Sequence, residues 1–192
     1  LGEPMVQPAG KRFIVHNPPA VMTTAELDAL YELPFERAPH PSYTRPIPAF
    51  QMIRDSINAH RGCVSGCSFC SLSLHQGRRI LSRSRESVRR EVELLTRQPG
   101  FKGHITDIGG PSANMYGIGC RASWKCQRES CLFPDLCPNL QLATSRWLDL
   151  LDDAASVPGV KSATVGSGIR YDLFMKDPDR AALLERLLAT HI

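Results

Sequence analysis

Three cysteines within eight residues constrain this chain more than any other feature of its sequence. Cys63, Cys67 and Cys70 have the spacing C-x3-C-x2-C. Glycine and serine fill most of the positions between them, so this loop can wrap closely around a bound group and point backbone N–H groups at it. Three thiolates can hold three irons of a cubic [4Fe-4S] cluster and leave the fourth iron open to another ligand. Phe69, just before the third cysteine, offers an apolar ring beside that open iron.

The same three cysteines have two other interpretations. Cys67-x2-Cys70 resembles a zinc knuckle, but zinc requires a closed set of four ligands, which Cys63 or a distant cysteine would complete. The third interpretation is simple buried thiols. The chain has seven cysteines, an odd number, and the tight trio suits metal ligation better than a disulfide framework. We therefore expect a reducing, cytoplasmic environment.

Several blocks of the sequence resemble one known family. They are RGCVSGCSFCSLSLHQGR (61–78), DIGGPSANMYGIGC (107–120), the spaced cysteines that follow, and GSGIRYDL (166–173). Together they resemble the YgiQ-type branch of the radical S-adenosylmethionine (SAM) enzymes, over roughly residues 41–190.

This resemblance implies a chemistry and its cofactors. The amino and carboxylate groups of SAM would chelate the open iron of the [4Fe-4S] cluster. The reduced cluster would then cleave SAM to methionine and a 5'-deoxyadenosyl radical, which acts on an unknown substrate. The electron would come from a reductant protein of the flavodoxin or ferredoxin type.

The resemblance also assigns a role to Gly109 and Gly110, which end an expected strand. In radical SAM enzymes a glycine pair at this place lets the backbone approach the methionine amino group of SAM, and a Cβ would block that approach. Many relatives have glutamate next, whereas this chain has Pro111. The amino group would therefore depend on backbone acceptors, with Asp107 as a weaker candidate.

Arg170 and Ser167 follow the third expected strand and face the presumed cavity. The planar guanidinium of Arg170 suits the carboxylate of SAM or an anionic substrate. It suits an ion pair with Asp172 or Asp177 equally well. The three nearby histidines are expected to be core or loop residues rather than ligands: His60, His75 and His104.

A second set of cysteines, Cys120, Cys126, Cys131 and Cys137, has the spacing C-x5-C-x4-C-x5-C. Four thiols in eighteen residues can bind a second iron-sulfur cluster or a structural zinc ion. The spacing matches no ligation motif that we can justify. A second metal site and free or partly ligating thiols therefore remain equal alternatives.

Apolar periodicity predicts an α/β fold. Expected strands 49–60, 104–108 and 160–165 alternate with a helix that starts at Ser84 and ends before Pro99, and with helices 145–155 and 177–189. Such alternation predicts a parallel sheet. Combined with the resemblance, it predicts a partial (β/α) radical SAM barrel with about three of six βα units.

Residues 1–48 are expected to form an N-terminal extension and proline-rich linker, with a short strand at 13–15 and a helix over 25–33 capped by Thr24. Residues 49–192 would be the N-terminal half of the radical SAM core. A complete eight-unit barrel needs about 250 residues. The chain has 192, starts with leucine and stops after an amphipathic helix, so we expect a fragment of a longer protein, which by itself could bind a cluster but would hold SAM poorly.

Composition excludes some classes and leaves others open. No run of 18 apolar residues occurs, so no membrane span is expected. The net charge of +4 comes largely from arginines between Arg78 and Arg90, which predict either a helix face with Glu/Arg pairs or a phosphate-contacting strip for RNA. Two rival functions follow: an iron-sulfur electron-transfer module without SAM chemistry, and a zinc-bound structural domain that binds RNA.

Overall fold

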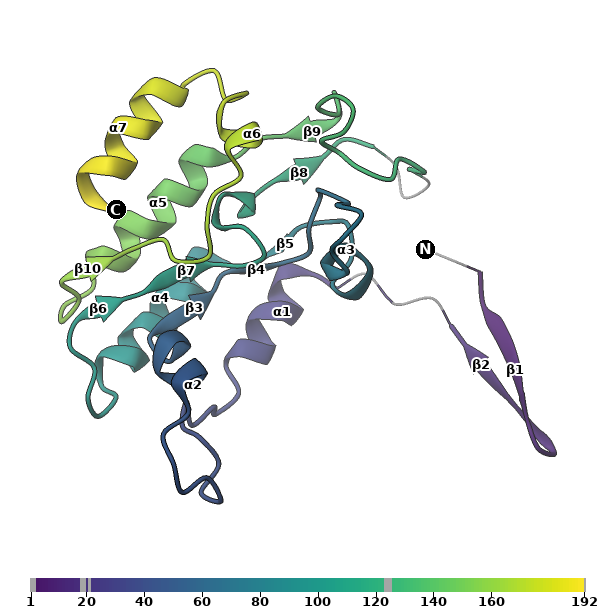
Figure 1. Ribbon diagram of the computed structural model, residues 1–192, viewed down its shortest axis with the longest axis horizontal. Coiled ribbons are helices and arrows are strands. Elements are labelled where there is room, and N and C mark those ends of the chain that lie inside the picture. The colour runs from purple at the N-terminus through teal and green to yellow at the C-terminus, as the bar shows by residue number, and fades with distance from the viewer. Residues whose placement is uncertain (1–2, 18–19, 21, 123–125, 192) are drawn as a thin grey trace.

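A computed structural model describes residues 3–17, 20, 22–122 and 126–191 of the chain (Figure 1). It contains short strands and helices that alternate through most of the sequence. The elements in chain order are β1 Met5–Ala9, β2 Arg12–His16, α1 Thr24–Tyr31, α2 Pro48–Ile53, β3 Ser56–Asn58, β4 His60–Arg61, α3 Leu72–His75, β5 Leu81–Ser82, α4 Arg85–Thr96, β6 His104–Ile105, β7 Asp107–Gly109, the 3-10 helix η1 Ala113–Met115, β8 Gly119–Cys120, β9 Leu140–Gln141, α5 Thr144–Ala155, β10 Ser162–Ala163, α6 Tyr171–Phe174 and α7 Arg180–Thr190.

Two parallel strand pairs lie at the centre of the molecule. β3 pairs with β7, which places Ile57 opposite Ile108, and β10 pairs with β6, which places Ala163 opposite Ile105. The mixed α/β class is therefore confirmed. The predicted partial barrel with three βα units is not confirmed, because the parallel ladders are only two and three residues long and belong to separate two-stranded sheets.

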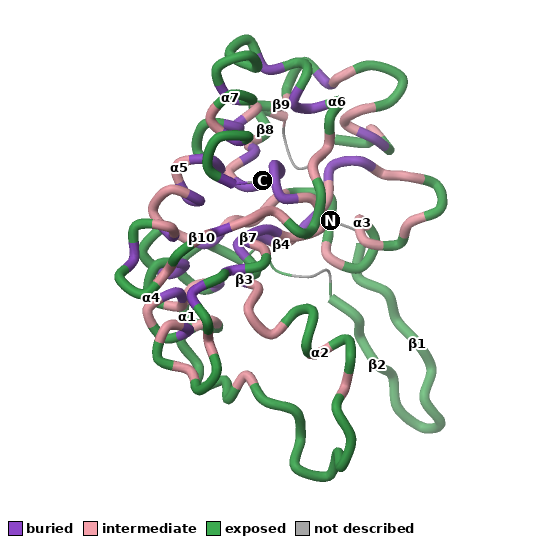
Figure 2. Tube along the Cα trace, turned by 60° about the vertical axis from the view of Figure 1, so that its left-hand side comes forward, coloured by how far each residue is buried: buried purple, intermediate pink, exposed green. Residues whose placement is uncertain are grey.

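One hydrophobic core joins these strands to the helices that follow them. Figure 2 shows the buried residues concentrated around β3, β7 and β10, with exposed chain toward the periphery. Each element contributes one apolar face, as expected when helices pack on a central sheet. Fully buried members of the core include Ile57, Val92, Leu95, Ile105, Ile108, Trp147, Leu148, Leu151 and Ala163.

The two central helices match their predictions. Ser84 caps α4, and its side chain accepts a hydrogen bond from the backbone N–H of Ser87 at 3.1 Å. Glu86 lies in the first turn of α4, where a negative charge favours the helix dipole. The predicted inward face of α4 is buried, and so is that of α5. These residues are Val88, Val92 and Leu95 in α4, and Trp147, Leu148 and Leu151 in α5.

The predicted first strand, 49–60, is wrong over its first half. Pro48 starts helix α2, because proline at the first helical position has its φ angle already fixed and gives up an N–H that would have no partner there. The strand character that remains is confined to β3 and β4. No residue of α2 is buried, so this helix lies on the surface, as Figure 2 shows.

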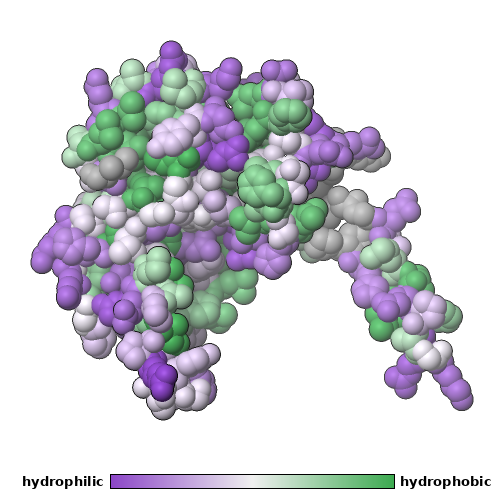
Figure 3. All heavy atoms as spheres, in the orientation of Figure 1, coloured by the Kyte–Doolittle hydropathy of each residue, from purple (hydrophilic) through white to green (hydrophobic). Residues whose placement is uncertain are grey.

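The N-terminal region contains more structure than its sequence predicts. The predicted strand 13–15 lies within β2, which pairs antiparallel with β1, a strand that was not predicted. Figures 1 and 3 show this hairpin extending away from the rest of the molecule, with polar and apolar side chains both exposed on it. Helix α1 is capped by Thr23, one residue before the predicted cap, and Glu26 completes a capping box.

The last helix starts later than predicted. α7 begins at Arg180 rather than at Asp177. Leu183 and Leu187 are buried, but Leu184 and Leu188 are 42% and 56% exposed, so only half of the predicted leucine face packs inward.

Four of the six arginines between Arg78 and Arg90 pair with carboxylates. Arg89 lies 3.2 Å from Glu93 within α4, and other arginines reach acidic residues outside it. The predicted Glu/Arg pairing is therefore confirmed, while RNA binding stays an untested prediction. The other pairs are Arg83–Glu91, Arg85–Asp153 and Arg90–Glu32.

Candidate metal centre

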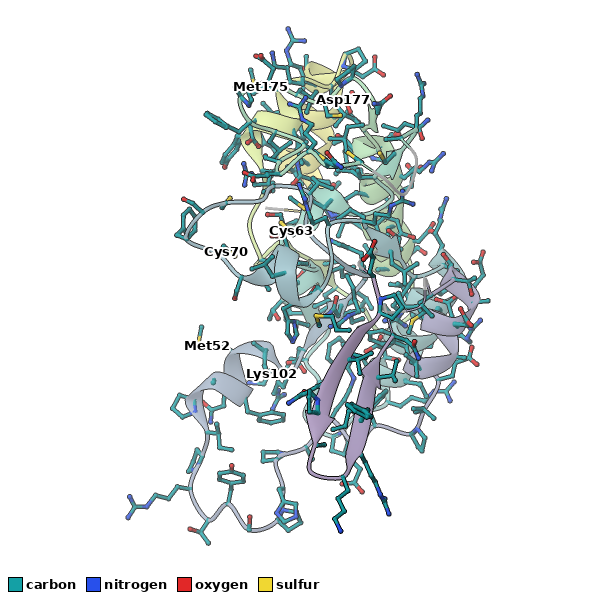
Figure 4. All side chains as sticks on the ribbon, turned by 90° about the vertical axis from the view of Figure 1, so that its right-hand side faces the viewer. Met52, Cys63, Cys70, Lys102, Met175 and Asp177 are labelled. Atoms are coloured by element: carbon teal, nitrogen blue, oxygen red, sulfur yellow. The ribbon has the colours of Figure 1, made fainter. Side chains whose placement is uncertain are left out.

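The first three cysteines lie on one tight loop, residues 62–71, between β4 and α3; we call it the cysteine loop. Gly62 has a φ angle of +93°, which glycine adopts without strain. The backbone N–H of Cys63 donates to the carbonyl of Gly77 at 3.0 Å. This hydrogen bond joins the start of the cysteine loop to the chain that follows α3. In Figure 4, Cys63 and Cys70 lie on the loop that projects from the body of the molecule.

All three cysteines of the loop line a single cavity of about 150 Å³. Phe69 lies at the edge of this cavity and is 91% exposed. Arg170, which is distant in the sequence, also lines the cavity. Thiolates of a [4Fe-4S] cube each bind a different iron, so they must face a common space rather than meet at one point. The donor set fits such a cube. Within the part of the chain that the structure describes, no three His, Cys, Asp or Glu side chains are gathered to hold a single metal ion.

Arg170 is held against the cysteine loop by its guanidinium. Nη1 donates to Ser65 Oγ at 2.9 Å and contacts Cys67 Sγ at 3.5 Å, while Nε donates to Asp172 Oδ1 at 3.0 Å. Hydrogen bonding to Asp172, and then to Cys67, raises the pKa of Arg170. The predicted ion pair with Asp172 is therefore present, and a fixed positive charge lies beside one of the three thiols. Binding of the SAM carboxylate by Arg170 remains a prediction.

Asn114, which the sequence did not identify as a site residue, holds the backbone of Arg170. Its Oδ1 accepts from the N–H of Arg170 at 2.9 Å, and its Nδ2 donates to the carbonyl of Arg170 at 3.0 Å. Asn114 is 2% exposed. A buried amide needs such partners, so an asparagine within an otherwise apolar and small stretch was the signal in the sequence.

Gly109 and Gly110 line a second cavity of about 300 Å³. This cavity shares Leu72 and Pro111 with the first, so the two lie next to each other. A Cβ on Gly110 would lie 2.7 Å from the ring of His60. Tight packing therefore requires glycine at this position whether or not a ligand approaches, and contact with the SAM amino group remains a prediction.

Ser167 lines neither cavity. Its backbone N–H and its hydroxyl both donate to Asp107 Oδ1, at 2.9 and 3.0 Å, and the N–H of Gly166 donates to the same oxygen. Asp107 therefore fastens the loop after β10 to the end of β7. These hydrogen bonds use only Oδ1, and Asp107 lines the second cavity, so a contact between this carboxylate and the SAM amino group remains a prediction.

Of the three histidines predicted to lie in the core or in loops, only His60 does so, because His75 ends helix α3 and His104 begins strand β6, both at the surface. His60 is 1% exposed, and burial lowers its pKa to about 4. Neither of its ring nitrogens has a hydrogen-bond partner among the described residues. His75 is exposed at the end of α3, and the ring of exposed His104 lies 2.9 Å from Ser162 Oγ.

Comparison with known proteins shows which proteins this chain resembles. Residues 1–56 match the family model described as radical SAM N-terminal. A UPF0313 protein of Methanocella arvoryzae is 53% identical over 180 residues, which cover 92% of this chain and 30% of that protein. The chain is a relative of the UPF0313 proteins. A UPF0313 protein of Methanosarcina acetivorans is 49% identical over the whole chain and 26% of its own length, and one of Geobacter sulfurreducens is 48% identical over 98% and 31%.

Relationship to UPF0313 proteins confirms the resemblance to YgiQ-type radical SAM proteins. It also extends that resemblance beyond 41–190, because the similarity includes the N-terminal residues. The chain spans about a quarter to a third of the length of these UPF0313 relatives. The family-model match ends at Ser56, before the cysteine loop, so the roles of the three cysteines depend on the sequence and the cavity.

Proposed function

We propose that this chain is the part of a radical SAM iron-sulfur protein that holds the [4Fe-4S] cluster and provides one wall of the SAM site. The observation that carries the proposal is the single cavity lined by Cys63, Cys67, Cys70 and Arg170. The cavity of the Gly109–Gly110 turn adjoins it, at the place where SAM would extend from the cluster.

When bound and reduced, such a cluster supplies the electron that splits a carbon-sulfur bond of SAM. The chain contributes binding, orientation and charge. The three thiolates would hold three irons, and the cation of Arg170 offsets part of their negative charge at Cys67. Phe69 also lines this cavity, with its ring 91% exposed, and its place beside the open iron is part of the proposal.

The partners and the substrate remain parts of this proposal. A flavodoxin- or ferredoxin-type donor in the cytoplasm would supply the electron. The names of the UPF0313 relatives state no activity, and one radical SAM core serves many reactions, so we assign no substrate. Among the described residues, no helix is both long and apolar enough to cross a bilayer.

Anaerobic reconstitution with iron and sulfide tests the proposal. We expect about four irons per chain and a reduced-cluster resonance that changes when SAM is added. Replacing Cys63, Cys67 and Cys70 together with serine should abolish this iron, whereas Cys120→Ser should retain it. A cluster that SAM leaves unperturbed would favour electron transfer instead. Stoichiometric zinc without iron would favour the structural module.

Arg170 gives a second prediction for the reconstituted chain. Arg170→Met removes a positive charge beside Cys67, so we expect the reduction potential to fall by something on the order of tens of millivolts. Arg170→Lys keeps the charge and should recover most of the difference. Protein-film voltammetry measures both variants. Equal potentials in the parent chain and Arg170→Met would show that this charge does not act on the cluster.

A further inference from the structure

The turn that follows β7, residues 109–114, lies against both cavities. Gly109, Gly110 and Pro111 line the second cavity, while Pro111 and Ser112 line the cavity of the cysteine loop. The turn runs into η1, where Asn114 is 2% exposed. A polar side chain buried this deeply needs hydrogen-bond partners, and the identity of those partners indicates its role.

Both described hydrogen bonds of the Asn114 side chain go to the backbone of one distant residue. Its Oδ1 accepts from the N–H of Arg170 at 2.9 Å, and its Nδ2 donates to the carbonyl of Arg170 at 3.0 Å. The side-chain amide therefore pairs with the main chain of Arg170 much as one strand pairs with another. Next to it, the N–H of Ala113 donates to the carbonyl of Gly168 at 2.9 Å. Three hydrogen bonds thus fix residues 168–170 to the turn.

The other polar contacts of Arg170 do not fix it to the body of the fold. Asp172 pairs with its guanidinium, but this residue is only two positions further along the same segment. Ser65 and Cys67 both lie on the cysteine loop, which Arg170 would have to be held against. Among the described residues, Asn114 is therefore the hydrogen-bond partner that ties Arg170 to the rest of the fold.

We propose that Asn114 is a positioning residue, which holds the cation of Arg170 beside Cys67 and so raises the reduction potential of the cluster. This inference rests on the proposed function, because it concerns a cluster bound by the cysteine loop. A positive charge close to a thiolate ligand favours the added electron, and its effect weakens as the charge moves away. Asn114 lines neither cavity, so its effect acts through Arg170.

The reduction potential of the reconstituted chain tests this role. Asn114→Ala removes both hydrogen bonds to Arg170. We expect the potential, measured by protein-film voltammetry, to fall most of the way to that of Arg170→Met. Asn114→Ala combined with Arg170→Met should show no further fall, because a residue that acts only through Arg170 has no effect once that charge is gone. An unchanged potential in Asn114→Ala, or a fall that adds to that of Arg170→Met, would overturn the proposal.

Tyr116→Phe is the matched control. Tyr116 is buried two residues beyond Asn114, and its hydroxyl donates to the carbonyl of a different arginine, Arg83, at 2.9 Å. Arg83 lines neither cavity. The control variant loses a buried hydrogen bond near the same turn and leaves the contact with Arg170 in place, so its potential should equal that of the parent chain. A fall as large as in Asn114→Ala would mean that general loosening, rather than the position of Arg170, sets the potential.

Amide hydrogen exchange tests the contact in the metal-free parent chain, without any variant that must fold. The N–H of Arg170 donates to buried Asn114, whereas the N–H of neighbouring Ile169 has no acceptor among the described residues. We expect the Arg170 amide to exchange at least about tenfold more slowly than that of Ile169. Equal rates would show that Asn114 does not hold Arg170. A chain that binds no cluster would overturn the proposed function, whereas a cluster whose potential ignores Asn114 would overturn this inference alone.

Discussion

A chain carrying Gly62→Ala is expected to lose about 4 kcal/mol of unfolding free energy, a loss at the upper end for single substitutions. Gly62 has a φ angle of +93°, a conformation that costs a residue with a Cβ about 1–3 kcal/mol. A Cβ here would also lie 2.8 Å from the carbonyl carbon of Arg79 and closer still to its oxygen. Since that obstacle is backbone, no side-chain rotation relieves it, and the cysteine loop must move.

Gly77→Ala is the matched control for this substitution. Gly77 has nearly the same φ angle, +91°, and lies at the other end of the same region, but a Cβ there would meet nothing within 4 Å. We therefore expect Gly77→Ala to cost about 1–3 kcal/mol, from backbone strain alone. Urea unfolding of the metal-free chain measures both variants. Equal losses for the two would mean that Arg79 gives way and that the loop is not tightly held.

The two central helices were predicted best, because the sequence signals for each of them lie within a few residues of one another. Helix α4 has a serine cap, an acidic first turn and an apolar face at helical spacing, and all three signals are satisfied within one element. Helix α5 likewise buries the predicted Trp147 and Leu151. Such signals lie within one helix and do not depend on distant residues, so the predicted helices match the observed ones.

The strands were predicted less well, because a strand is defined by its partner. Residues 160–165 and 104–108 mix apolar with polar side chains, and parallel pairing among the described residues is limited to β10 with β6 and β3 with β7. In residues 49–60 the apolar side chains of α2 suggested a strand, while Pro48 was the competing signal for a helix start. A two-residue ladder leaves no periodicity to detect.

The candidate site was partly predictable for a similar reason. The spacing of the three cysteines made them ligand candidates, but their sharing a cavity with Arg170 depends on a contact more than 100 residues distant along the chain. Asn114 supports that contact through the backbone of Arg170. Ser167 was placed on the correct strand end, yet its hydrogen bonds go to Asp107 rather than to the cavity. Position along a strand predicts the edge of the sheet but not which way each side chain turns.

The stability of the metal-free chain is expected to fall by about 3 kcal/mol between pH 7 and pH 4 through His60 alone. Burial lowers the pKa of His60 from 6.5 to about 4, because its ring is fully enclosed and has no charged partner to stabilise the protonated form. The folded pKa lies below the unfolded one, so the unfolded chain binds the proton more readily. The stabilisation is therefore complete above about pH 6.5, is lost as the pH falls toward 4, and is constant below that.

His60→Leu separates this effect from every other acid-sensitive group. The substitution keeps a side chain of similar size against Gly110 and removes two buried nitrogens that have no hydrogen-bond partner among the described residues. At pH 7 we expect the variant to be within about 1 kcal/mol of the parent chain, since mismatched packing and the relief of unpaired polar atoms act in opposite directions. Toward pH 4 the variant should become the more stable of the two by about 2–3 kcal/mol. Urea unfolding at a series of pH values gives the difference curve, and a ring-proton NMR titration of His60 checks its pKa directly. Parallel curves, or a His60 ring that titrates near pH 6.5, would mean that water or a counter-charge reaches this ring and that the strand beneath Gly110 is less tightly packed than its burial implies.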